Sequence, residues 1–133
     1  MRFLLDTNIV SDLIRNPYGQ AGARLAEVGE HNVCTSIIVA AELRYGAARK
    51  AAPSLSRRIE AMLHRLDVVT LEPPVDAVYA ELRAGLEEVG RPIGGNDLFI
   101  AAHALALGCT LVSGNRREFS RVVHLRLENW LDD

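Results

Sequence analysis

The sequence has few features that would tie it to a membrane, a disulfide framework or a zinc site. No apolar run approaches the roughly 20 residues of a membrane span, and the N-terminus lacks a secretory pattern. Cys34 and Cys109 lie in short apolar stretches without a CxxC partner, so we expect buried free thiols. These absences predict a cytoplasmic protein that is not attached to a membrane.

Several catalytic signatures are missing as well. The four histidines show no HxxxH or HExxH spacing, and no GxSxG, Walker or GxGxxG motif is present. His103 falls on an apolar helical pattern, where packing is the simpler interpretation. The sequence therefore contains no arrangement typical of a side-chain nucleophile with its general base.

Lysine is nearly absent from the sequence: Lys50 is the single lysine, and the other fourteen basic residues are arginines. Guanidinium groups suit phosphates and stacked bases, although genome composition explains such a bias equally well. The formal net charge of −2 argues against a protein that coats nucleic acid non-specifically. It does not exclude a nuclease, since two bound divalent ions would make the sum positive.

The composition is that of an ordinary globular domain. With 133 residues, 49% hydrophobic and 24% charged, the chain is long enough to bury about two thirds of its unfolded surface. No repeat, low-complexity stretch or linker divides it. We therefore expect a single domain over residues 1–133.

Short apolar strands alternate with helices along the chain. We expect strands at 2–5, 33–35, 68–71, 111–113 and 122–127, helices at 8–15, 21–28, 36–48, 54–66, 73–89 and 96–107, and a short turn at 116–119. This alternation predicts an α/β sandwich around a mainly parallel sheet. Pockets in such sheets form beyond the carboxyl ends of the strands.

Three acidic residues, Asp6, Glu42 and Asp97, stand in or beside apolar stretches. Each has an ordinary explanation. Asp6 would cap a helix, Asp97 would interact with a helix dipole, and Glu42 would pair with an arginine such as Arg49 or reach solvent. Together they indicate a shared divalent cation, because carboxylates gathered at one place repel unless a cation holds them. Oxygen ligands without cysteine or histidine pairs favour Mg²⁺ or Mn²⁺ over zinc.

The expected topology can bring these residues to one edge of the sheet. Asp6 ends the first strand, Asn115 lies just past the strand at 111–113, and Asp97 begins the helix that leads into that strand. Glu42 lies about two turns into its helix and reaches this edge only if the helix leans inward.

Four segments in order carry these residues: LLDTN at 4–8, VAAELRYG at 39–46, GGNDLFIAAHA at 94–104 and LVSGNRREF at 111–119. In sequence and spacing they resemble the successive motifs of PIN-domain proteins, and most closely the VapC toxins of bacterial VapBC toxin–antitoxin pairs. The resemblance covers nearly the whole chain. It implies a PIN-like three-layer α/β/α sandwich with a mainly parallel central sheet.

The resemblance also implies an activity and partners. The expected activity is a Mg²⁺- or Mn²⁺-dependent endoribonuclease that cuts structured RNA, often tRNA or rRNA, through a metal-activated water and so stops translation. The expected partner is a cognate VapB-type antitoxin that occludes the site. The toxin itself is expected to be a homodimer, which would form a heterotetramer or a larger complex with the antitoxin.

By motif position, Asp6, Glu42 and Asp97 correspond to the catalytic, metal-binding acids, and Thr7 or Asn8 would support them. One departure is Asn115, where many relatives carry an aspartate. Asn115 or the nearby Glu118 would then serve as an additional metal ligand. The candidates for substrate contacts are the three arginines nearest in sequence to these residues: Arg44, Arg116 and Arg117.

Two alternatives remain open from the sequence. One is a nuclease in RNA processing without a toxin role. The other is a catalytically inert PIN-fold module that binds RNA or protein, which Asn115 in place of an acid favours. The helices at 21–28 and 54–66 are the candidates for an antitoxin groove, because exposed apolar stripes mark partner surfaces.

Overall fold

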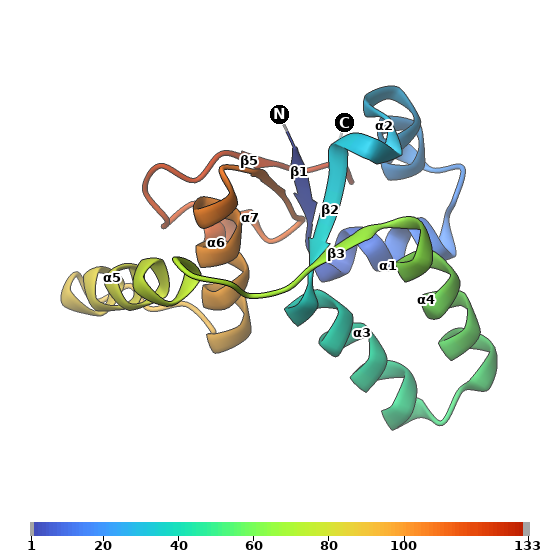
Figure 1. Cartoon of the computed structure of the whole chain (residues 1–133), viewed down its shortest axis with the longest axis horizontal. Helices are drawn as coiled ribbons and strands as arrows, with labels where there is room; N and C mark the ends of the chain where they lie inside the picture. Colours follow the sequence, from blue (N-terminus) through green and yellow to red (C-terminus); the bar gives the residue numbers. More distant parts are fainter. Residues whose placement is uncertain (1, 132–133) are drawn as a thin grey trace.

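A parallel β-sheet of five strands forms the centre of the fold (Figure 1). The computed structural model describes residues 2–131, so residues 1, 132 and 133 of the predicted domain lie outside the described residues. The strands are β1 (Phe3–Leu5), β2 (Val33–Ser36), β3 (Asp67–Val69), β4 (Thr110–Val112) and β5 (Leu127–Glu128). They lie in the order β3-β2-β1-β4-β5, and every neighbouring pair is parallel.

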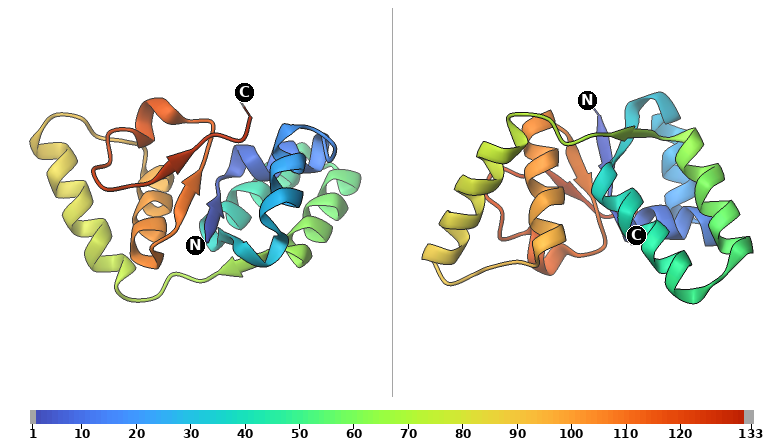
Figure 2. Two further views of the ribbon diagram at one scale, coloured as in Figure 1. Left: turned by 90° about the horizontal axis from the view of Figure 1, so that it is seen from above. Right: turned by 60° about the horizontal axis from the view of Figure 1, so that its bottom comes forward.

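The helices form a layer on each side of this sheet, as Figures 1 and 2 show. One layer contains α1 (Thr7–Arg15), α2 (Gln20–Val28), α3 (Ile37–Lys50) and α4 (Pro53–Arg65), with the short 3₁₀ helix η1 (Glu30–Asn32) before β2. The other layer contains α5 (Val75–Glu88), α6 (Gly95–Leu107) and α7 (Arg116–Phe119). The chain changes layers after β3 because it returns across the sheet to β4, and right-handed connections then place the helices on the opposite face. The predicted three-layer sandwich is confirmed.

Local sequence signals explain where several helices begin and end. Ser36 caps α3 by accepting a hydrogen bond from the backbone N–H of Ile38 at 3.1 Å, and Pro53 opens α4. Gly108 ends α6 in the left-handed conformation, with φ at 68°. Between residues 2 and 131 no helix combines the length and the apolar character that a membrane crossing requires.

The core lies between the sheet and the two helical layers. Its fully buried side chains come from the strands and from the helices, and they include Leu4, Leu5, Ile9, Ile100 and Leu111. The two cysteines are buried and free, as expected. His103 is also completely buried, and its Nδ1 atom lies 2.8 Å from the Ser36 hydroxyl, which joins α6 to the start of α3.

The prediction of a strand over 122–127 is wrong for most of that range. Only Leu127–Glu128 pairs with β4. Val122 instead packs in the core directly after α7, and His124 adopts a φ of 70°, which turns the chain away from an extended path. The apolar residues of this segment therefore serve as anchors of a loop rather than as alternate positions of a strand.

Candidate active site

Asp6 lies at the carboxyl end of the central strand and is almost completely buried, with 4% of its surface exposed. Its carboxylate accepts hydrogen bonds from the Thr7 backbone N–H at 2.8 Å and from the Ser113 hydroxyl at 2.7 Å. The first bond is the expected cap of α1. Burial raises the pKa of Asp6, the two hydrogen bonds lower it, and the negative charge of Glu42 raises it. Hydrogen bonds from the start of α1 and from the loop after β4 therefore hold Asp6 close enough to Glu42 for the two carboxylates to repel each other.

Glu42 reaches the same edge of the sheet from the second turn of α3. The Thr7 hydroxyl donates a hydrogen bond to Glu42 Oε1 at 2.5 Å, and the Asn96 side chain donates to Oε2 at 3.4 Å. Within residues 2–131 Glu42 takes part in no ion pair, so the alternative of a salt bridge to Arg49 is not observed. The inward lean of α3 on which the prediction depended is present, because Glu42 contacts residues at the starts of both α1 and α6.

Asp97 occupies the first turn of α6 and is half-buried. The Asn115 side-chain amide donates a hydrogen bond to Asp97 Oδ2 at 3.1 Å. Burial is the largest cause that raises the pKa of Asp97 to about 7, followed by a hydrogen bond with Glu118 and by the charges of Asp6, Glu118 and Glu42. Four carboxyl groups are thus near enough to influence one titration. We call Asp6, Glu42, Asp97 and Glu118 the acidic rim.

The loop after β4 contains a residue that the sequence analysis missed. Ser113 is fully buried, and its hydroxyl both donates to Asp6 and accepts the backbone N–H of Asn115 at 2.9 Å. Asn8 fixes the same loop by accepting the Gly114 backbone N–H at 3.1 Å. The one available signal was position, since a small hydroxyl residue directly follows a buried strand at the edge where Asp6 was expected.

The two polar residues after Asp6 therefore differ in what they contact. Thr7 orients Glu42, whereas Asn8 holds the loop at Gly114. Thr7 contacts two members of the acidic rim, because its backbone N–H also donates to Asp6, whereas Asn8 acts only on the neighbouring loop. The supporting role of both residues stays a prediction. Asn115 also contacts the acidic rim, but through its amide N–H₂ group, which leaves the amide oxygen free to accept or to coordinate.

The three arginines expected to contact substrate have different surroundings. Arg44 forms two hydrogen bonds to Glu60, at 3.0 and 2.9 Å, and so joins α3 to α4. Arg116 lines a hollow beside β5 together with Arg24 and Trp130, and Arg117 is exposed. None of the three pairs with the acidic rim in the described residues, and their substrate role stays a prediction.

The donor set of the acidic rim fits a hard divalent cation. Its carboxylates come from four separate elements, and no lysine or arginine in residues 2–131 pairs with Asp6, Glu42 or Asp97. Oxygen donors of this kind are those that Mg²⁺ and Mn²⁺ prefer. In the part of the chain that the structure describes, no three acidic, histidine or cysteine side chains are already arranged around a common metal position. Burial is the main cause of the raised pKa of Asp97, and the neighbouring carboxylates raise that pKa further.

This arrangement agrees with a comparison of the chain with known families. A sequence model of the PIN domain matches residues 3–125. The chain belongs to the PIN-domain family. All four segments that suggested the resemblance fall inside the matched range.

Relatives within the PIN family cover the chain over almost its full length. Ribonuclease VapC2 of Haemophilus influenzae is 39% identical over 132 residues, which cover 98% of this chain and 99% of that protein. The tRNA(fMet)-specific endonuclease VapC of Shigella flexneri is 35% identical over 131 residues, with 98% of each chain covered. The chain is therefore a VapC-type PIN ribonuclease of the VapBC toxin–antitoxin group, and the full-length similarity to ribonucleases favours this reading over an inert binding module.

Solved structures of VapBC complexes have the same fold. VapBC2 from Rickettsia felis, bound to a DNA fragment from its promoter, matches with a TM-score of 0.88 at 38% identity, covering 98% of this chain and 99% of that one. DNA-bound VapBC from Salmonella typhimurium matches with a TM-score of 0.91 at 33% identity, covering 98% of each chain. The PIN fold expected from the motifs is thus confirmed.

Proposed function

We propose that this VapC-type ribonuclease cuts a structured RNA, such as a tRNA or an rRNA, at the acidic rim, with Mg²⁺ or Mn²⁺ as its cofactor. The observation that supports this proposal is the convergence of Asp6, Glu42 and Asp97 from three elements without a cationic partner in the described residues. A purely structural set of carboxylates would be expected to have arginine or lysine partners, as the exposed acid Glu60 has.

Each acid has a distinct task in this proposal. Asp6 and Asp97 would hold the cation, and Glu42 would bind it as well or orient the attacking water, since Thr7 fixes one of its oxygens. Asn115 and Glu118 would supply additional oxygen donors beside Asp97. A bound Mg²⁺ or Mn²⁺ ion supplies positive charge that acidifies water and offsets the charge that develops on the phosphodiester.

The protein residues also set the pH at which the site can work. Asp97, with its pKa raised to about 7, holds a proton in slightly acidic solution, and it must lose this proton to act as an anionic ligand. We therefore expect the apparent affinity for Mn²⁺ to weaken as the pH falls below about 7.

The test is metal-dependent cleavage of total tRNA and of rRNA by Asp6→Asn and Asp97→Asn variants. Asparagine keeps the capping function of Asp6 but removes the charge, so we expect both variants to fold and to lose cleavage by a factor of about 100 or more. Asp76→Asn is a matched control, because Asp76 occupies the first turn of α5 as Asp97 occupies that of α6. Folded variants that cut as fast as the parent would refute the catalytic assignment.

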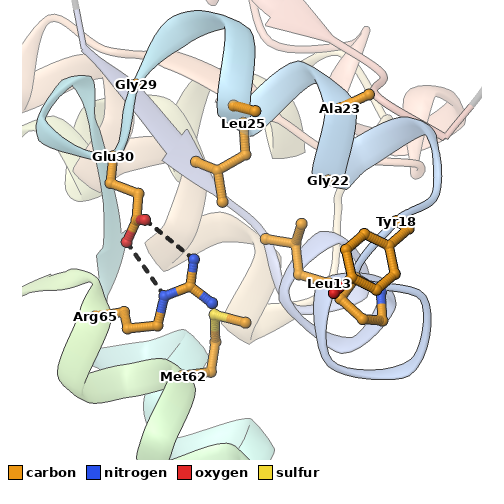
Figure 3. Close-up of a pocket in the computed structure, with 11 residues that line it drawn as sticks. Leu13, Tyr18, Gly22, Ala23, Leu25, Gly29, Glu30, Met62 and Arg65 are labelled. Carbon is orange, nitrogen blue, oxygen red and sulfur yellow. Dashed lines mark hydrogen bonds and ion pairs between the residues drawn. The ribbon is translucent and has the colours of Figure 1, made fainter.

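We also propose that a VapB-type antitoxin, the kind of partner present in the solved VapBC complexes of relatives, binds the surface between α2 and α4. A pocket of about 520 Å³ lies there, with apolar walls from Leu13, Leu25 and Met62 (Figure 3). The Arg65–Glu30 ion pair, at 3.0 Å, closes one side, and the side chain of Tyr18, 99% exposed, stands at the other. Such a mixture of apolar walls with an exposed aromatic is typical of a protein-binding surface.

The antitoxin surface can be tested separately from catalysis. Ala23 lines the pocket and is exposed, so Ala23→Glu places a charge in it without disturbing the core. We expect this variant, and Tyr18→Ala, to weaken binding of the antitoxin encoded beside the gene while tRNA cleavage is unchanged. Unchanged antitoxin affinity would reject this surface. Light scattering of the free and bound forms would test the proposed homodimer and heterotetramer in the same experiment.

A further inference from the structure

A groove of about 450 Å³ leads away from the acidic rim between α1 and α3, with α4 as its outer wall. At one end it contains Thr7 and Glu42, which are hydrogen-bonded to each other. At the other end it contains Arg15 and Lys50. The groove therefore connects the proposed reaction site to two cations that the reaction itself does not use.

The spacing of residues along the two helices explains this layout. Thr7, Ser11 and Arg15 follow one another at intervals of four on α1, and Glu42, Gly46 and Lys50 do so on α3. Residues four apart lie on the same face of a helix. Eight residues of helix span about 12 Å, so the two cations lie about that far from the Thr7–Glu42 pair.

Neither cation is neutralised by an acid in residues 2–131. Arg15 donates only a long hydrogen bond, 3.4 Å, to its own helix at the Ser11 carbonyl, and no ion pair involves Lys50. Both residues lie in the last turn of their helices, where the helix dipole favours positive charge. The dipole explains the sign of the charge, but not the placement of both side chains along one groove that begins at the acidic rim.

Gly46 keeps the middle of this groove open. A glycine inside a helix costs about 1 kcal/mol relative to alanine, and here no neighbouring group requires it, because a Cβ at Gly46 would have no atom within 4 Å. Its effect is instead on the groove, whose wall it forms without a side chain. The partly exposed apolar residues Ile14 and Leu55 line the same stretch.

We propose that this groove holds the RNA strand next to the cleaved bond, with Arg15 and Lys50 each binding a backbone phosphate about 12 Å from the acidic rim. The proposal rests on the ribonuclease function above and adds a second contact region for the same strand. The favoured occupant is RNA rather than a protein segment, because the free charges at the far end are both positive and a nucleic-acid strand carries a phosphate at every nucleotide. Ribose and base faces would lie on Ile14 and Leu55.

The experiment measures cleavage of total tRNA by the full-length protein in Mn²⁺, with two groove variants. Arg15→Gln/Lys50→Gln removes the phosphate contacts, and Gly46→Leu fills the middle of the groove with a residue that favours helix. We expect KM to rise about tenfold in each with little change in kcat, because contacts far from the reacting bond bind substrate and transition state equally. Binding of a fluorescein-labelled single-stranded RNA is measured in the Asp97→Asn background, in which we expect the RNA to stay uncut. There the negative slope of log affinity against log salt should become shallower by about 1.4 when Arg15→Gln/Lys50→Gln is added, since each lost phosphate contact removes about 0.7.

Two matched controls separate a groove effect from charge or helix effects. Arg83→Gln/Arg91→Gln removes the same charge on and just beyond α5, which lies on the opposite side of the sheet from α3 (Figure 1). Gly85→Leu makes the same change as Gly46→Leu at a helical glycine of α5 whose Cβ would also meet no atom within 4 Å. Both controls should keep the parent KM.

The outcomes distinguish the two proposals. A parent protein that does not cut tRNA or rRNA in Mn²⁺ would refute the proposed function. A parent that cuts, while both groove variants keep its KM and the double variant keeps its salt slope, would overturn the groove proposal alone. The same conclusion would follow if the groove variants changed only the affinity for an antitoxin, because the groove would then be a protein-binding site.

Discussion

Replacing Asp97 with asparagine should make the metal-free protein more stable at neutral and alkaline pH, although it removes a proposed metal ligand. The pKa of Asp97 is about 7 in the folded protein, against an ordinary value of 3.8. Between these values the folded chain holds a proton that the unfolded chain has released. The free energy of unfolding therefore falls as the pH rises from about 4 to about 7, and it stays lower above that range. Asparagine resembles the protonated carboxyl group at every pH and avoids this loss.

The size of the effect follows from the two pKa values. A shift of about three units at 1.36 kcal/mol per unit gives about 4 kcal/mol as a ceiling. Asp97 is only half-buried, and solvent screening reduces the expected gain to about 1–2 kcal/mol. For a chain of this size that corresponds to a rise of about 3–8 °C in the melting temperature.

Thermal unfolding followed by circular dichroism in EDTA measures this directly. The advantage of Asp97→Asn over the parent should be small near pH 5 and largest near pH 8, and millimolar Mn²⁺ should reduce or reverse it, because the metal stabilises only a chain that binds it. Asp76→Asn, in the first turn of α5, is the control and should show no such pH-dependent advantage over the parent. If the curves for Asp97→Asn and the parent run parallel across this pH range, the electrostatic argument for the acidic rim is wrong.

Two further substitutions probe the surroundings of the site. Ser113→Ala removes the hydroxyl that bonds both Asp6 and the Asn115 backbone, so urea denaturation should show a loss of about 1–3 kcal/mol, and the acid limb of the pH–rate profile should move to higher pH. Arg44→Gln breaks an exposed ion pair with Glu60, which should leave the urea midpoint nearly unchanged. A raised KM for tRNA with that midpoint kept would support the predicted substrate role of Arg44. An unchanged KM would refute that role.

The sequence was sufficient to predict the parts of the site that depend on local chain direction. Asp6 follows the first strand and Asp97 opens the helix before β4, and parallel topology takes both positions to the same edge of the sheet. Glu42 is different, because its place depends on the tilt of α3. That tilt is set by packing and by the Thr7 contact, which no local pattern encodes.

Two features were not predicted correctly, the role of Ser113 and the path of residues 122–127, and both depend on contacts between residues far apart in the sequence. Ser113 lies 107 positions from Asp6, and only the pairing of β1 with β4 brings the two together. The apolar residues of 122–127 looked like a strand, but the left-handed His124 and the burial of Val122 against the core take the chain elsewhere. Hydrophobic periodicity indicates which residues are buried, but it does not indicate which residues they pack against.

The strand order has a consequence for the time at which the protein becomes active. The first strand lies in the middle of the sheet, and its neighbour β4 comes only from the last quarter of the chain. A chain still emerging from the ribosome carries Asp6 and Glu42 early, but it lacks Ser113 and Asn115, which complete their surroundings. The contacts around Asp6 and Asp97 in this ribonuclease therefore cannot be complete until synthesis has passed Asn115.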